Sequence, residues 1–100
     1  HNLYELGSTF KPITVAAAID AGTVTSMARR YDATKPLAIA GHQIRDLHSQ
    51  ERWLNVPETL IHSSNITTAL IADELGAERM QRVFEQLEFR IHVFEDPVRF

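Results

Sequence analysis

The sequence contains no cysteine, which excludes a disulfide framework and any zinc site with thiolate ligands. It also lacks a long hydrophobic run. The longest candidate, residues 13–21, is about half of the roughly 20 apolar residues that a transmembrane helix needs, and it contains Thr14 and Asp20. There is no internal repeat and no low-complexity segment. We therefore expect a globular unit rather than a membrane-spanning or fibrous one.

Positive charge is also scarce. The chain has 10 Lys and Arg residues against 13 Asp and Glu residues, and its formal net charge is -3. A nucleic-acid partner or an anionic membrane surface favours a basic patch, and the sequence has none. The histidines are scattered, and no pair has the i, i+4 spacing of a helical zinc site. We expect no metal, no cofactor and no nucleic-acid partner.

What the chain does have is an ordinary globular balance, with 44% hydrophobic and 23% charged residues. A unit of 100 residues buries only a modest share of its surface, however. The chain begins at His1 without an initiator methionine and ends at Phe100 without an obvious stop. We expect both ends to be cuts and residues 1–100 to be part of a larger domain.

The first helix is expected to begin near Ser8 and to end at Gly22. Ser8 and Thr9 are good capping residues, and Pro12 is tolerated because the first amide groups of a helix have no intrahelical acceptor. The run at residues 13–19 is apolar almost all round, which predicts burial on every side. Because 100 residues can hardly provide that cover, we also expect an exposed apolar face and self-association of the chain.

Further along, residues 23–34 are expected to form a loop, with a helical turn near residues 27–31. Short apolar alternation on both sides of Gly41 predicts a small hairpin within residues 37–48. Asn55 followed by Pro57 predicts a helix running toward His62. Two more helices are expected, one from Ser64 or Asn65 to Gly76 and one over about residues 78–89. Residues 91–100 show no assignable pattern.

Ser8 and Lys11 form the central chemical motif. At the start of a helix, residues three apart lie on one face, so the Lys11 amine can reach the Ser8 hydroxyl. A serine becomes a good nucleophile when a neighbouring base takes its proton. The positive end of a helix favours an uncharged lysine and directs backbone N–H groups at a developing oxyanion. By itself the motif is also compatible with a capping serine and a solvated lysine.

The surrounding sequence resembles the penicillin-binding proteins. Residues 4–12, YELGSTFKP, are similar to the active-site stretch Y-E-P-G-S-x-x-K-P of that family, with Leu6 in place of proline. Ser63-Ser64-Asn65, which begins 55 residues after Ser8, resembles the second motif, S-x-N. Residues 41–46 resemble the G-H-x-I-x-D segment of cell-division members. Taken without the first motif, Ser63-Ser64-Asn65 would be an ordinary helix cap.

The resemblance implies a class B penicillin-binding protein, closest to the septal division transpeptidase. It implies that Ser8 is acylated by the D-Ala-D-Ala stem peptide and by β-lactam antibiotics, with Lys11 as the base. Ser63 would relay a proton to the leaving nitrogen, and Asn65 would hold Lys11 and bind the substrate amide. The parent would cross-link peptidoglycan at the periplasmic face of the cytoplasmic membrane, anchored by an N-terminal transmembrane helix outside this chain and in contact with division-complex membrane proteins.

The expected fold is a mainly α fragment, a helical lobe with a minor β-hairpin, of the α/β fold shared by transpeptidases and serine β-lactamases. The third motif of the family, K-T-G or K-S-G on a strand, is absent from the chain. Residues 1–100 would then hold two of three motifs without the main sheet, and the chain alone would be incomplete for catalysis.

Two alternatives remain open. One is a serine β-lactamase or β-lactam sensor. The sequence Ser-Thr-Phe-Lys is common in class D β-lactamases, but their second motif ends in valine rather than Asn65, and class A enzymes prefer aspartate where Ser64 stands. The other is a non-catalytic helical interaction module, which would keep the helices and fail to acylate.

Overall fold

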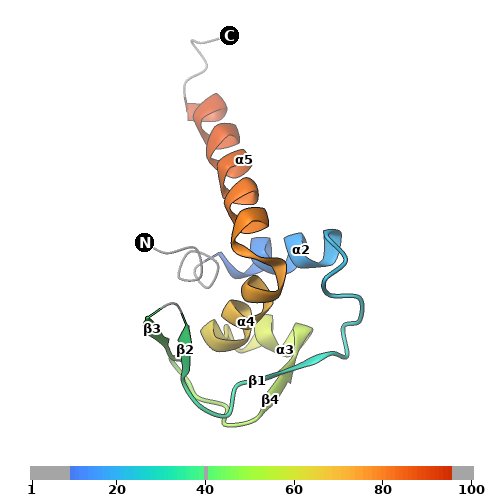
Figure 1. The fold of residues 1–100 in the computed structure, drawn as a ribbon, viewed down its shortest axis with the longest axis vertical. Coiled ribbons are helices and arrows are strands. Elements are labelled where there is room, and N and C mark those ends of the chain that lie inside the picture. Colours follow the sequence, from blue (N-terminus) through green and yellow to red (C-terminus); the bar gives the residue numbers. More distant parts are fainter. Residues whose placement is uncertain (1–9, 40, 96–100) are drawn as a thin grey trace.

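The computed structural model describes residues 10–39 and 41–95, which form four helices and two small antiparallel sheets (Figure 1). The helices are α2 (Lys11–Asp20), α3 (Val56–Ile61), α4 (Asn65–Leu75) and α5 (Ala77–Glu95). The strands are β1 (Arg30–Asp32), β2 (Leu37–Ile39), β3 (His42–Ile44) and β4 (Trp53–Asn55). The expected helix-rich unit with a minor hairpin is confirmed, and a second two-stranded sheet, β1 with β4, accompanies the hairpin.

Helix α2 has Pro12 in its first turn, where a missing N–H costs no intrahelical hydrogen bond. Its capping residue is Ala21, and Gly22 follows with a φ of 78°, so the predicted end at Gly22 is confirmed. The helix begins at Lys11, after the capping residue Phe10, so the predicted start near Ser8 is three residues too early. Ser8 itself lies outside the described residues. After the helix, the amides of Thr23 and Val24 both donate to the Ala18 carbonyl and turn the chain back toward the core.

Each sheet is a pair of strands. β2 and β3 form the predicted hairpin, with Leu37 opposite Ile44, and Gly41 in the connection has a φ of 77°. β1 pairs with β4, and Tyr31 lies opposite Leu54. The prediction of a helical turn near residues 27–31 is therefore wrong for Arg30 and Tyr31, which belong to strand β1. Arg30–Asp32 is a strand because a partner far along the chain supplies its hydrogen bonds, which a local pattern does not reveal.

Helices α3 and α4 begin and end as predicted. Asn55 caps α3 through a capping box, in which its side chain accepts from the Glu58 N–H and the Glu58 side chain accepts from the Asn55 N–H. Ser64 caps α4 by accepting from the Thr67 N–H at 3.1 Å. Gly76 ends α4 with a φ of 92°.

Helix α5 is longer than predicted. It runs over Ala77–Glu95 and projects from the body of the molecule (Figure 1), whereas the sequence pattern predicts an end near Phe89. No glycine or proline interrupts the chain between Gly76 and Pro97, and a proline disfavours helix in the residue before it. Among the described residues, no helix is both long enough and apolar enough to cross a membrane.

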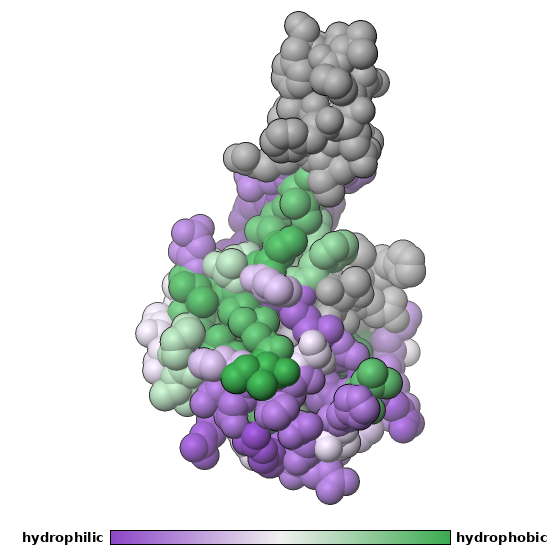
Figure 2. Space-filling view, turned by 180° about the vertical axis from the view of Figure 1, so that it is seen from behind, coloured by the Kyte–Doolittle hydropathy of each residue, from purple (hydrophilic) through white to green (hydrophobic). Residues whose placement is uncertain are grey.

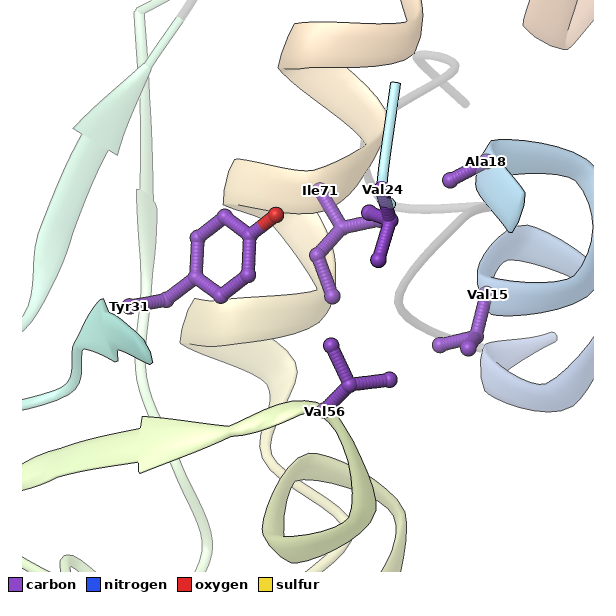
Figure 3. Close-up of a cluster of buried hydrophobic side chains, with 6 residues drawn as sticks. All are labelled: Val15, Ala18, Val24, Tyr31, Val56 and Ile71. Carbon is purple, nitrogen blue, oxygen red and sulfur yellow. The ribbon is translucent and has the colours of Figure 1, made fainter. Parts of the chain in front are cut away.

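The largest buried cluster joins α2 and α4 to β1, to α3 and to the loop that follows α2 (Figure 3). Ile71 of α4 lies at its centre, and Val15 and Ala18 reach it from α2. The cluster consists of Val15, Ala18, Val24, Tyr31, Val56 and Ile71. A second cluster fixes the hairpin to α4 through Ile44, Ile66 and Ala69. The two clusters make α4 the element on which the other parts converge.

One side of the molecule remains apolar. Residues coloured as hydrophobic gather on the left of the space-filling view, over the side on which α2 and α3 lie, and continue up onto α5 (Figure 2). Exposed large hydrophobic side chains on α2 and α3 are Ile19, Leu60 and Ile61, and Ile61 is 75% exposed. Helix α2 is not buried on every side, because Ile19 is 43% exposed whereas Val15 and Ala18 are buried. The predicted exposed apolar face is confirmed.

Candidate functional site

The turn between α3 and α4 carries two of the candidate residues, Ser63 and Asn65. Helix α3 ends in the paired hydrogen bonds of a Schellman motif. The Ser63 N–H donates to the Leu60 carbonyl at 3.2 Å, and the Ser64 N–H donates to the Thr59 carbonyl at 2.9 Å. This geometry requires a left-handed residue at the turn, and Ser63 occupies that position with a φ of 50°.

Glycine is the usual residue at this position because it has no Cβ to collide with the following carbonyl. An L-residue in the left-handed region costs about 1–2 kcal/mol. The Ser63 side chain is exposed, so core packing does not explain why a serine stands there. A strained residue with an exposed hydroxyl suggests a functional role for that hydroxyl.

Ser64, the middle residue of the motif, plays a different part because it is fully buried. Its hydroxyl donates to the Asp46 carboxylate at 2.8 Å and accepts from the Thr67 N–H at 3.1 Å. Its carbonyl accepts from the Thr68 hydroxyl at 2.7 Å. Every one of these contacts fixes the backbone on which the exposed neighbour Ser63 stands.

Two buried threonines, Thr59 in α3 and Thr67 in α4, connect the helices on either side of the same turn. The Thr67 hydroxyl donates to the Thr59 hydroxyl at 2.9 Å, and the Thr59 hydroxyl donates to the Asn55 carbonyl at 2.9 Å. This chain of hydroxyls connects the start of α3 to the first turn of α4. Buried hydroxyls that are fully hydrogen-bonded make a core rigid and unique, which holds the turn in one conformation.

Asn65 is the first residue of α4, and its side chain is half-buried. Its Nδ2 donates to the Arg45 carbonyl at 3.0 Å. The next amide, that of Ile66, donates to the Asp46 carboxylate at 2.9 Å. The Asn65 side chain is therefore held against the end of the hairpin rather than left to rotate in solvent.

Lys11 is the first residue of α2 and is half-buried. Phe10 beside it packs on Phe84 of α5, with ring centroids 5.8 Å apart. Helix α2 packs on α4 through the cluster around Ile71 (Figure 3). Ser8 lies outside the described residues. The structure thus brings Ser63 and Asn65 onto one turn, and Lys11 onto a helix that packs against the helix following this turn.

A cluster of charged and polar side chains, Arg52, Glu58 and His62, lies at α3 and its C-terminal end. The Arg52 guanidinium contacts Glu58 at 2.7 Å and lies 3.3 Å from the His62 Nε2. The capping bond from the Asn55 N–H, and after it the Arg52 guanidinium, lower the pKa of the Glu58 carboxyl. Glu58 therefore stays an anion at neutral pH, which suits an acceptor in the first turn of a helix.

A second polar group connects β1 to α4 away from this turn. The Tyr31 hydroxyl donates to the Glu74 carboxylate at 2.6 Å, and Arg29 forms an ion pair with Glu74 and lies over the Tyr31 ring. Burial, and then the hydrogen bond to Glu74, raise the pKa of the Tyr31 phenol well above its usual value. The described residues contain no cluster of histidine and acidic side chains that could bind a metal.

Comparison with known proteins decides the family. The model of the penicillin-binding protein transpeptidase domain matches residues 1–96. The chain belongs to this family.

Two curated relatives of the transpeptidase family align over 86 residues, which are 86% of this chain and 14% of theirs. The probable peptidoglycan D,D-transpeptidase FtsI of Caulobacter vibrioides is 41% identical, and the probable peptidoglycan D,D-transpeptidase PenA of Neisseria gonorrhoeae is 34% identical. The chain thus spans about a seventh of the length of these relatives. No solved structure matches the chain significantly.

The sequence pattern assigns no role to Asp46, and it gives Ser64 only the role of a helix cap. The signal was present, because Asp46 ends the G-H-x-I-x-D segment that supports the resemblance. Only the fold shows its partner, because it places the Asp46 carboxylate against the hydroxyl of Ser64, 18 residues further along the chain.

Proposed function

We propose that this chain is part of a peptidoglycan D,D-transpeptidase that works through an acyl-enzyme on Ser8. The observation that carries the proposal is the match to the transpeptidase family over residues 1–96, a span that includes both Ser8-Thr9-Phe10-Lys11 and Ser63-Ser64-Asn65. The names of the curated relatives agree with this activity.

In the proposed reaction, the Ser8 oxygen attacks the carbonyl carbon of the penultimate D-Ala of a stem peptide. A C–O bond forms, the C–N bond to the terminal D-Ala breaks, and D-Ala leaves as the amine. Lys11 takes the Ser8 proton, and Ser63 passes a proton to the leaving nitrogen. An amine of a second peptide then displaces Ser8 and completes the cross-link.

Two features of the turn support these roles. Ser63 presents an exposed hydroxyl, which a proton relay needs, and it has a strained backbone conformation of the kind that clusters at active sites. Asn65 donates its Nδ2 to the Arg45 carbonyl. With the Nδ2 directed at Arg45, the Asn65 amide oxygen is the atom proposed to accept from the Lys11 ammonium. The substrate amide is proposed to bind the same side chain.

We further propose that the complete enzyme contains the third motif, K-T-G or K-S-G, outside these 100 residues, together with the main sheet. The chain alone would then be incomplete for catalysis. The proposed location is the periplasmic face of the cytoplasmic membrane, and septal division-complex membrane proteins are the proposed partners. In isolation, the chain is proposed to self-associate through the apolar side of α2 and α3, where Ile19 and Ile61 are exposed.

The test is intact-mass spectrometry after incubation with benzylpenicillin. It compares the full-length protein containing this chain with its Ser8→Ala variant, and it includes the isolated chain in parallel. The proposal predicts a stable penicilloyl adduct on the full-length protein, lost in Ser8→Ala.

Rapid release of the penicilloyl group would instead indicate a β-lactamase, and an adduct that persists in Ser8→Ala would exclude Ser8 as the nucleophile. No adduct on a folded full-length protein would indicate a non-catalytic module. An adduct on the full-length protein but not on the isolated chain would identify the chain as an incomplete lobe.

A further inference from the structure

The end of the hairpin contacts the Ser63-Ser64-Asn65 turn through Asp46, which follows β3. Both oxygens of the Asp46 carboxylate are used. Oδ2 accepts from the Ser64 hydroxyl at 2.8 Å, and Oδ1 accepts from the Ile66 N–H at 2.9 Å. The two donors, Ser64 and Ile66, are the residues before and after Asn65 in the sequence. One carboxylate therefore holds both neighbours of Asn65, the motif residue that is proposed to bind the substrate amide.

Arg45, the residue before Asp46, adds a third hydrogen bond between the hairpin and the turn. The Arg45 carbonyl accepts from the Asn65 Nδ2 at 3.0 Å, so residues 45 and 46 together hold three consecutive residues of the turn. The hairpin is itself fixed to α4, because Ile44 packs in one cluster with Ile66 and Ala69. Its position is therefore set by packing that does not involve the motif.

The Asp46 carboxylate also suits its electrostatic surroundings. The Ile66 N–H belongs to the first turn of α4, where the amides have no intrahelical acceptor and the helix dipole favours an anion. Ser64 is fully buried, so its hydroxyl proton would lose its acceptor if the carboxylate were removed. A buried donor without an acceptor is costly, and the turn would shift to relieve it.

Such a shift would act on Ser63, which the network holds at a φ of 50° against its own preference. With the support gone, Ser63 is free to relax toward an ordinary conformation, and its hydroxyl and the Asn65 amide would both change direction. A displacement of about 1 Å in a catalytic group can lower a rate by about 100-fold.

We propose that Asp46 is a positioning residue for acyl transfer, acting through Ser64 and Ile66 to fix the directions of the Ser63 hydroxyl and the Asn65 amide. This inference rests on the proposed acyl-enzyme function. It adds a residue outside the Ser8-Thr9-Phe10-Lys11 and Ser63-Ser64-Asn65 motifs that touches neither the substrate nor the reacting atoms.

The test measures benzylpenicillin acylation of the full-length protein by stopped-flow or quenched-flow mass spectrometry. The variants are Asp46→Asn, which keeps an acceptor for the Ile66 amide, and Asp46→Ala, which keeps none. Asp73→Asn is the matched control, because Asp73 is an exposed acid on α4, the helix whose first turn Asp46 contacts. Hydrogen exchange of residues 63–67 in each variant reports the turn without reference to activity.

We expect the limiting acylation rate constant at saturating benzylpenicillin to fall by about 10- to 100-fold in Asp46→Ala and by less in Asp46→Asn. The dissociation constant of the non-covalent benzylpenicillin complex should change less than the acylation rate constant. General unfolding would instead abolish both binding and acylation. Amide exchange at Ile66 should accelerate in Asp46→Ala, and the Asp73→Asn control should match the wild type in every measurement.

Wild-type acylation rates in both folded Asp46 variants would overturn the positioning role and leave the proposed function intact. The proposed function would fail separately if the wild-type protein were not acylated, or if Ser8→Ala were acylated as fast as the wild type. Should Asp46→Ala fail to fold, Asp46→Asn decides the outcome, since a wild-type rate there together with unchanged exchange at Ile66 also refutes the proposal.

Discussion

Replacing Ser63 with glycine should make the protein more stable and less active at the same time. Ser63 stands at the left-handed position that ends α3, with a φ of 50° and an exposed side chain. Removing the Cβ relieves a strain of about 1–2 kcal/mol. Glycine also gains conformational freedom in the unfolded chain, which offsets about 0.4–1 kcal/mol of that relief. The net expectation is a stabilisation of roughly 0.5–1 kcal/mol.

Ser63→Ala is the matched control, because it removes the same hydroxyl and keeps the strained Cβ. Its free energy of unfolding should stay within about 0.5 kcal/mol of the wild type, as expected for an exposed substitution. Both variants should lose acylation by benzylpenicillin, by about 100-fold or more, since both lack the hydroxyl that is proposed to move the proton.

Urea unfolding of the full-length protein and its variants measures the stability, and the rate of penicilloyl adduct formation measures the chemistry. A Ser63→Gly variant less stable than Ser63→Ala would refute the account of backbone strain. Acylation at the wild-type rate in either variant would refute the role of the Ser63 hydroxyl. The two parts of the reasoning can therefore fail independently.

Two further predictions concern Tyr31 and the apolar side of α2 and α3. The raised pKa of Tyr31 means that the unfolded phenol ionises first, so stability should fall as pH rises above the usual 10.0, by up to about 1.4 kcal/mol per pH unit. Urea unfolding of Tyr31→Phe should show a shallower fall, and equal slopes would contradict this. The isolated chain should self-associate in light scattering as its concentration rises, and Ile61→Glu should weaken this. A monodisperse monomer at high concentration would refute the prediction.

Local signals predicted most helix boundaries. Asn55 with Glu58 three residues later is a capping box, Ser64 is a good N-cap, and Gly22 and Gly76 end helices with a positive φ. Each of these devices acts within a few residues, so a sequence contains all the information needed to recognise it.

Two wrong predictions concern features that no local pattern marks. One feature depends on a partner far along the chain, and the other on the lack of a residue that ends a helix. The strand at Arg30–Asp32 exists because it pairs with Trp53–Asn55, and its own residues carry no alternation long enough to reveal it. Helix α5 continues beyond Phe89 because nothing stops it before Pro97, although its apolar pattern weakens earlier.

The sequence by itself determined where the two motifs of the family stand, at Ser8 and Lys11 and at Ser63 and Asn65, and it predicted the helices that carry Lys11 and Asn65. These depend on residue type and short spacing. Only the tertiary structure decided what holds the second motif in place. Asp46 and Ser64 meet because the hairpin packs on α4 through Ile44, and a contact of that kind arises from burial of apolar surface rather than from any local pattern.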